Sequence, residues 1–172
     1  MEIEKLSLDE MRRRGYDSST IARTLAADVR LEEFRRKADD LIKDIKAVFP
    51  ENIPRPEITR SVARGYDDEY MLSKARFEEL AARDPEQKWT DVTDESLKEY
   101  GAQFCFLDAE GWLFYLPACM CHNLRNFPGG YDDVYYACKN RTHIELLNEQ
   151  QLLCTDRFMA LCDEYDHGSS GI

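Results

Sequence analysis

Long apolar runs are missing from this 172-residue sequence. No stretch approaches the roughly 18 uninterrupted apolar residues that a bilayer-spanning helix needs. Residues 1–14 contain no apolar segment of the kind that directs export. These absences predict a cytoplasmic protein that does not associate with a membrane.

The sequence also lacks an excess of basic residues. Its 23 lysines and arginines face 34 aspartates and glutamates, which gives a net charge of −11. Residues 1–50 are neutral as a whole, so all of the excess negative charge follows Pro50. Such a domain repels nucleic-acid phosphate and anionic membranes and attracts basic proteins. We therefore expect a basic protein partner and no nucleic-acid partner.

Histidine is scarce, with three residues, and the six cysteines form no C-x2-C pair of the kind that holds structural zinc. Cys119, Cys121 and His122 are close in sequence, but neighbouring helical positions point about 100° apart and cannot converge on one ion. The spacing leaves open whether Cys138 and His143 approach them in space. Because no export segment is visible, we expect reduced and mostly buried thiols. We predict no metal and no cofactor.

A cysteine–histidine nucleophile is the main alternative. A thiolate needs a base and an orienting acid, and Cys121, His143 and Asp132 supply these residue types. No local signature links the three positions, so the sequence predicts no catalytic residue and no enzyme. The alternative function is a Cys/His-dependent enzyme or a metal-binding protein that uses the region around Cys121, His122 and His143.

Residues 1–50 are predicted to form a helical arm. Capping signals and apolar periodicity indicate short helices over 7–14 and 17–28 and a long amphipathic helix over 31–49. Three prolines between positions 50 and 56 then disfavour any continuation of the helix. They mark the predicted boundary between the neutral arm and the acidic part of the chain.

Residues 51–166 are predicted to form an acidic helical body, followed by a flexible tail at 167–172. Body and arm belong to one globular domain. The fold class is mainly α, a compact helical domain with at most one small pair of short strands, at 103–107 and 144–147.

The central helix of the body is predicted to begin at Asp108, a suitable N-cap residue. Pro117 lies inside its pattern and is expected to bend it. Large apolar residues spaced four apart line one face of this helix: Trp112, Leu116, Met120 and Leu124. This block is expected to form the core.

Paired acids occur at 67–68, 94–95 and 132–133, and each pair is interpreted as the start of a helix, where carboxylates cap free amide groups. Tyrosines accompany these acids, most densely at 129–136. Tyrosine beside acid is typical of surfaces that bind basic proteins. The candidate partner-binding residues are Asp67, Asp68, Tyr131, Asp132, Asp133, Tyr135 and Tyr136.

Four segments, at 15–37, 54–70, 84–95 and 106–128, resemble an uncharacterised bacterial family of unknown function. Its members share a block of aromatic, acidic and glycine residues that runs into Tyr-Leu-Pro-Ala, which stands here at 115–118. The resemblance implies a compact, mainly helical bacterial protein over most of the chain. It implies no catalytic motif.

These observations predict a non-catalytic bacterial protein-binding module. They leave its oligomeric state open. It would engage a basic partner through its acidic, tyrosine-rich surface. An immunity or antitoxin-like protein is the most concrete form of this hypothesis, because nuclease-like toxins are typically basic.

Overall fold

The computed structural model describes residues 6–99, 101–126 and 133–166. These residues form eight α-helices, two short 3-10 helices and no strand, which confirms the mainly α class. None of the helices in this part of the chain is long and apolar enough to cross a bilayer. The chain divides into two compact units, residues 1–36 and 37–172. The predicted arm and body, divided at Pro50, stay a prediction.

The first unit contains α1 (Leu8–Arg13) and the beginning of α2 (Ser18–Val48). Ser7 caps α1, because its Oγ accepts a hydrogen bond from the amide of Glu10 at 3.2 Å. Asp17 caps α2, because its Oδ1 accepts from the amides two and three residues further on. Side-chain caps therefore stand at the predicted starts of both helices, residues 7 and 17.

The two helices predicted over 17–28 and 31–49 are in fact one helix of 31 residues. The predicted break was wrong because no glycine or proline lies between the cap and Pro50. Polar residues such as Asp28 cost only a few tenths of a kcal/mol inside a helix. α2 ends at Val48, directly before the prolines.

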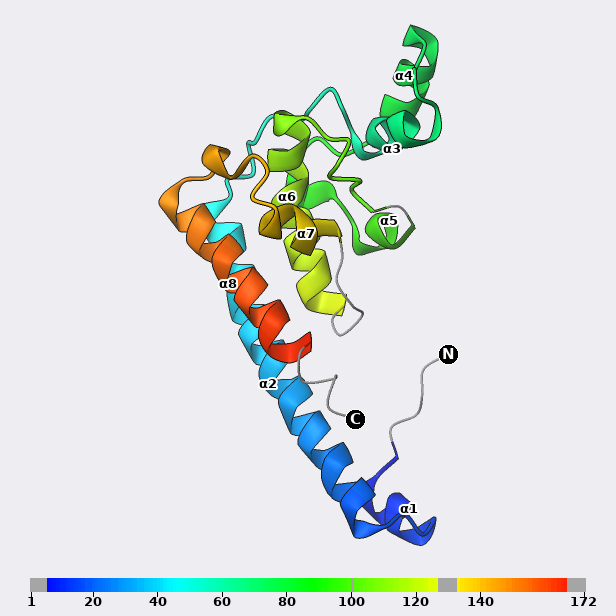
Figure 1. Ribbon diagram of the computed structural model, residues 1–172, viewed down its shortest axis with the longest axis vertical. Coiled ribbons are helices and arrows are strands. Elements are labelled where there is room, and N and C mark those ends of the chain that lie inside the picture. Colours follow the sequence, from blue (N-terminus) through cyan, green and yellow to red (C-terminus); the bar gives the residue numbers. More distant parts are fainter. Residues whose placement is uncertain (1–5, 100, 127–132, 167–172) are drawn as a thin grey trace. The chain divides into compact units, whose positions relative to one another are not determined.

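In the second unit, the last turns of α2 run antiparallel to α8 (Glu149–Asp166), as Figure 1 shows. Ion pairs join the two helices at Lys37–Glu164 (2.8 Å) and Asp44–Arg157 (2.7 Å). Such exposed pairs contribute less than about 1 kcal/mol each. The larger contribution is the burial of apolar side chains on both helices: Ala38, Leu41, Ile45, Phe49, Cys154, Phe158 and Leu161.

α6 (Ala109–Asn126) is the central helix of this unit. The carboxylate of Asp108 accepts a hydrogen bond from the amide of Gly111 at 2.8 Å, as its predicted capping role requires. The four residues predicted to face the core are at most 2% exposed, but nearly every other side chain from Gly111 to Leu124 is buried as well. Pro117 lies inside the continuous helix; the bend stays a prediction.

Neighbouring elements explain why α6 is buried on all sides. It contacts η1 (Trp89–Asp91), α5 (Asp94–Glu99) and α7 (Asp133–Lys139), and α7 in turn contacts α8. Asp94 and Asp133 open their helices, as predicted. Asp132 and the predicted tail lie outside the described residues.

Neither of the predicted strands forms. Residues 104–106 make a turn, and η2 (Ile144–Leu146) is a 3-10 helix. Gln103 and His143, at the start of the two segments, have φ angles of 53° and 57°. This left-handed backbone is incompatible with the extended conformation of a strand.

The interpretation of the acid pair at 67–68 as the start of a helix is also wrong. The chain instead forms α3 (Arg60–Asp68) and α4 (Lys74–Ala81), which lie side by side (Figure 1). α4 begins after Ser73, whose Oγ accepts from the amide of Arg76 at 3.2 Å. Asp67 and Asp68 therefore end a helix and do not precede one.

Gly111 provides a test of the packing around α6. A β-carbon at this position would lie 2.9 Å from the carbonyl oxygen of Ile58 and 2.9 Å from Cδ2 of Leu107. The backbone carbonyl cannot rotate away from it. We expect Gly111→Ala to lower the free energy of unfolding by about 1–3 kcal/mol, measured by urea denaturation.

Gly65→Ala in α3 is the matched control. A β-carbon there would first meet the end of the Leu80 side chain, which can change its rotamer. It should therefore cost less than Gly111→Ala. An equal or larger loss for Gly65→Ala would contradict the close approach assigned to α6.

Candidate functional site

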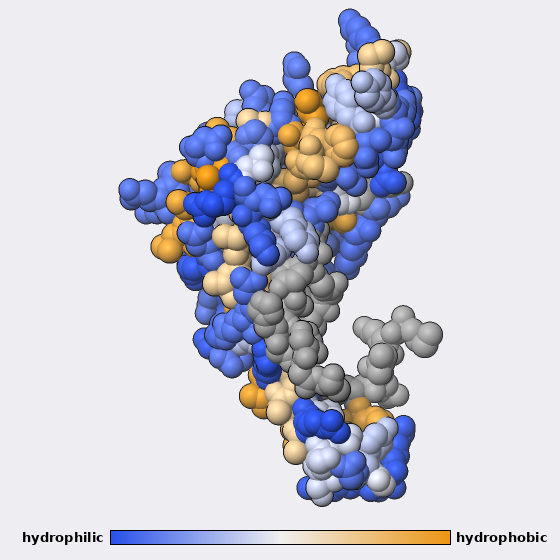
Figure 2. Space-filling view, in the orientation of Figure 1, coloured by the Kyte–Doolittle hydropathy of each residue, from blue (hydrophilic) through white to orange (hydrophobic). Residues whose placement is uncertain are grey.

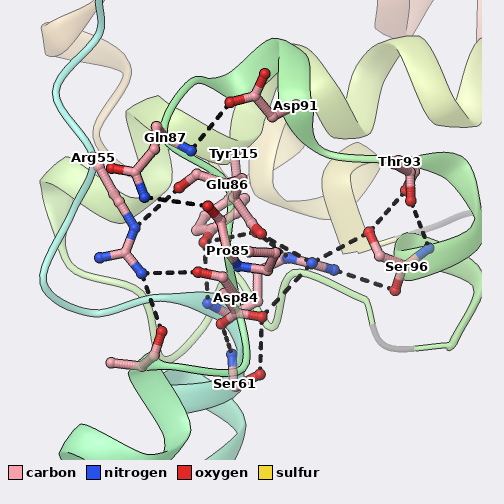
Figure 3. A network of polar contacts seen from close by, with 12 residues as sticks. Arg55, Ser61, Asp84, Pro85, Glu86, Gln87, Asp91, Thr93, Ser96 and Tyr115 are labelled. Carbon is pink, nitrogen blue, oxygen red and sulfur yellow. Dashed lines mark hydrogen bonds and ion pairs between the residues drawn. The ribbon is translucent and has the colours of Figure 1, made fainter.

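A buried group of charged side chains joins the start of α3 to the segment that precedes η1 (Figure 3). Arg60, Asp84 and Glu86 are each at most 5% exposed. The Arg60 guanidinium donates to Oε1 of Glu86 through Nη2 at 3.2 Å and Nε at 3.3 Å. Its Nη2 also lies 3.7 Å from Oδ1 of Asp84. Removing such charges from water costs several kcal/mol per ion, so these three groups have to remain paired.

Tyr115 of α6 completes the environment of these charges. Its hydroxyl donates to Oε1 of Glu86 at 3.3 Å and accepts from the amide of Arg60 at 3.4 Å. Burial, followed by the nearby carboxylates of Glu86 and Asp84, raises the pKa of the Tyr115 hydroxyl above its ordinary value. The hydroxyl therefore stays protonated and remains a donor. The Arg60 guanidinium also donates to the carbonyl and hydroxyl oxygens of Ser96.

Asp84 caps α3 across a sequence separation of 23 residues. Its Oδ2 accepts from the amide of Ser61 at 2.7 Å, and its Oδ1 accepts from the hydroxyl of Ser61 at 2.9 Å. Thr59, which stands at the N-cap position, makes no capping hydrogen bond with its side chain. The start of α3 therefore depends on a residue that follows α4.

Arg55 holds the other side of the same turn. Its guanidinium donates to the carbonyl oxygens of Ala81, Asp84 and Glu86 at distances of 2.9–3.1 Å. Arg55 and Arg60 together thus fix both the start of α3 and the chain that leaves α4. This arrangement determines where the loop between α3 and α4 lies in the second unit.

A hollow of about 340 Å³ borders this cluster and is lined by residues of α3, α4 and α5 and of the segment that follows α4. Its arginines are already engaged by carboxylates. Arg76 lies 2.6 Å from Glu69, and Arg83 lies 2.6 Å from Glu79. The hollow therefore offers charges of both signs and no concentrated positive site for an anion.

The loop between α3 and α4 exposes two large side chains. Tyr70 is 94% exposed and Met71 is 80% exposed. Tyr70 also has a φ angle of 22°, a strained backbone conformation for a residue with a side chain. The exposed carboxylates of Asp67 and Asp68 precede the two residues. We name the surface formed by Asp67, Asp68, Tyr70 and Met71 the α3–α4 tip.

The carboxylates of the α3–α4 tip differ in their pairing. Asp68 lies 3.5 Å from Nε of Arg64. Asp67 has no ion-pair partner among the residues that the structure describes. The tip therefore combines an aromatic ring, a thioether and net negative charge. Tyr70 and Met71 were not among the predicted partner-binding residues.

The other predicted partner-binding residues belong to α7 or precede it. Tyr136 is 50% exposed, and Asp133 is exposed at the first position of α7. Tyr135 is buried, and its hydroxyl donates to Oδ1 of Asp163 in α8 at 2.6 Å. Tyr131 and Asp132 lie outside the described residues. The predicted set is thus divided between the α3–α4 tip and α7.

The thiols are mostly buried, and Cys105 is the exposed one. Burial raises the pKa of Cys121 to about 11 and that of Cys138 to about 12. Cys121 and His143 line different hollows. Within the described part of the chain, no group of three or more His, Cys, Asp or Glu side chains is arranged to hold a metal ion.

His122 belongs to a cluster of polar contacts between α5 and α6. Its Nδ1 lies 3.1 Å from Oδ1 of Asp94, and Nε of Arg125 donates to Oδ2 of the same carboxylate at 2.8 Å. The hydrogen bonds from Arg125, aided by His122, lower the pKa of Asp94 to about 2. These contacts fasten α5 to α6. They give His122 a structural role.

Comparison with known proteins identifies one relationship. A family of unknown function (DUF6714) matches residues 37–166, from the first residue of the second compact unit to the end of α8. No curated protein matches the chain, and no solved structure matches it. The resemblance to an uncharacterised family is therefore confirmed.

The buried pairing of Arg60 can be tested by removing its charge. Arg60→Met would leave Asp84 and Glu86 buried without a counter-charge. We expect the free energy of unfolding to fall by about 3–5 kcal/mol, measured by urea denaturation followed by circular dichroism. Arg64→Met removes an exposed pair in the same helix and should cost less than about 1 kcal/mol. Similar losses for the two variants would show that the buried pairing does not hold α3.

Alkylation of the native protein tests the cysteine–histidine alternative. Only a thiolate reacts with iodoacetamide, so burial and raised pKa values should protect Cys121 and Cys138 at pH 8. We expect Cys105 to react first, as measured by mass spectrometry of peptides. The urea-unfolded chain, in which all six cysteines should react, is the control. Rapid alkylation of native Cys121 would support the enzyme alternative.

Proposed function

The chain belongs to this family of unknown function, and we propose that it is a non-catalytic protein-binding module that engages a basic partner through the α3–α4 tip. The observation that carries this proposal is the exposure of Tyr70 and Met71 beside Asp67 and Asp68. These four side chains supply two apolar anchors and a local negative charge.

The anchors have the character of interface residues. Tyrosine and methionine are enriched in protein–protein interfaces, and tyrosine is frequent among the residues that contribute most to binding. Tyr70 is almost fully exposed, so the unbound protein gains little stability from its ring. The ion pair of Glu69 with Arg76 joins the two sides of the loop at 2.6 Å, and a restricted loop loses less entropy on binding.

The net negative charge of the second unit supports the proposal that the partner is basic. All of the net charge of −11 belongs to residues 37–172, because residues 1–36 are neutral as a whole. The visible face of the protein is mostly hydrophilic, with apolar residues in small separate areas (Figure 2). A field of this sign increases the rate of encounter with basic proteins.

A toxin-neutralising immunity or antitoxin-like role is the most concrete form of the proposal, since nuclease-like toxins carry the complementary charge. Asp133 and Tyr136 of α7 stay candidate contacts for the same partner. The burial and raised pKa of Cys121 argue against the Cys/His-dependent alternative, and Cys121 and His143 line different hollows.

Photo-crosslinking in the cells that produce the protein tests the tip directly. A photoreactive phenylalanine at position 70 should capture one dominant basic protein, identified by mass spectrometry. The same group at Leu153, which is 59% exposed on α8, is the matched control and should not capture it. Equal capture at both positions, or capture of an acidic protein, would overturn the proposal.

Binding of the purified, captured protein then separates charge from apolar contact. Asp67→Lys should weaken binding about tenfold at low salt and less at high salt, because salt screens exposed charges. Tyr70→Ala should weaken binding about tenfold at both salt concentrations. Unchanged affinity in both variants would place the contact elsewhere.

A further inference from the structure

The first compact unit exposes an apolar face of α2. Leu25 is 39% exposed and Val29 is 65% exposed, and Ala22 and Ala26 are exposed as well. The four positions follow the spacing i, i+3, i+4 and i+7, which places their side chains on one side of a helix. We name the surface formed by Ala22, Leu25, Ala26 and Val29 the α2 stripe. It contains no charged or polar side chain.

The α2 stripe lies apart from the face of α2 that is partly buried within the first unit. The partly buried side chains include Ile21, Thr24 and Asp28. Because successive helical residues turn by about 100°, these three lie roughly a third of a turn away from the stripe. Packing of an apolar face supplies most of the stability of a helix in a protein. The stripe therefore has the pattern of a helical contact surface that is open to a partner.

The charges around the α2 stripe favour a second copy of this chain as the partner. Residues 17–36 hold four arginines and four acidic residues. Two copies of a neutral segment meet without net repulsion, and the arginines of each copy can approach the carboxylates of the other. The second unit carries the whole net charge of −11, so a contact through it would bring two strongly acidic surfaces together. Self-association is therefore most favourable through the first unit.

We propose that two copies of this chain pair through the α2 stripe, with Leu25 and Val29 of each copy packed against the stripe of the other. The contact is that of a short two-stranded coiled coil, in which apolar residues spaced three and four apart interdigitate. The stripe supplies far fewer residues than the roughly 20–30 per partner of a stable interface. The pair is therefore weak, with a dissociation constant in the micromolar range.

Sedimentation equilibrium of the full chain measures this pairing directly. One copy has a mass of 20.1 kDa. The weight-average mass should rise toward twice this value between about 5 and about 500 μM protein, a range that brackets a micromolar dissociation constant. The α2 stripe and the α3–α4 tip share no residue, so this proposal and the proposed function can fail independently.

A charge in the stripe should prevent the pairing. Val29→Glu would place a carboxylate between the two copies, and the dissociation constant should rise at least about tenfold. Ala27→Glu, the matched control, adds the same charge at an exposed position outside the stripe and should change the constant less than about threefold. Because both positions are exposed, neither change should unfold the protein, which circular dichroism checks.

A larger apolar side chain in the stripe should strengthen the pairing. Ala22→Leu adds apolar area to both copies, so the dissociation constant should fall about fivefold or more. Ala27→Leu makes the same change outside the stripe and should leave the constant unchanged. A gain of affinity cannot result from a loss of folding, so this pair of variants remains decisive if Val29→Glu is destabilised.

The proposal is overturned if the weight-average mass stays at that of one copy over the whole concentration range. It is also overturned if Val29→Glu associates as strongly as the unchanged chain does. Equal strengthening by Ala22→Leu and Ala27→Leu would likewise place the contact outside the stripe.

Discussion

The arrangement of α3 and α4 depends on the pairing of Arg60 with Glu86 and Asp84. Arg60 is the first residue of α3, where the positive end of the helix dipole opposes a cation. The two carboxylates compensate for this repulsion, and Asp84 also satisfies the amide of Ser61. The same contacts thus neutralise a buried charge and start a helix. Through Tyr115, these contacts also join the start of α3 to α6.

Features encoded within a few residues could be predicted from the sequence. The capping by Ser7 and Asp108 and the burial of Trp112 follow from local spacing, and the structure confirms them. The capping box at the start of α8 is equally local, since Asn148 and Gln151 exchange reciprocal hydrogen bonds, both at 3.0 Å. Each of these interactions joins residues no more than four positions apart, so a pattern in one sequence can reveal it.

Features that depend on distant residues could not be predicted. The cap of α3 is Asp84, which lies 23 residues after Ser61. Gly65 lies inside α3, although glycine disfavours a helix. Its missing side chain lets the Leu80 side chain approach the backbone of α3. Asp67 and Asp68 were therefore assigned to the wrong helix end. The exposure of Tyr70 follows from that tertiary arrangement and has no local signal.

Backbone strain occurs at a few positions outside the regular helices. In the described part of the chain, the non-glycine residues with positive φ are Tyr70, Gln103, Arg141 and His143. The first lies at the α3–α4 tip, and the other three lie in the turns before α6 and after α7. Strain of this kind persists only where the surroundings hold the backbone. At the tip, the ion pair of Arg76 with Glu69 joins the two sides of the loop. Beside α6, the rings of Phe104 and His143 pack against buried Trp112. Among the described residues, the strained positions therefore lie where paired or buried side chains hold the chain.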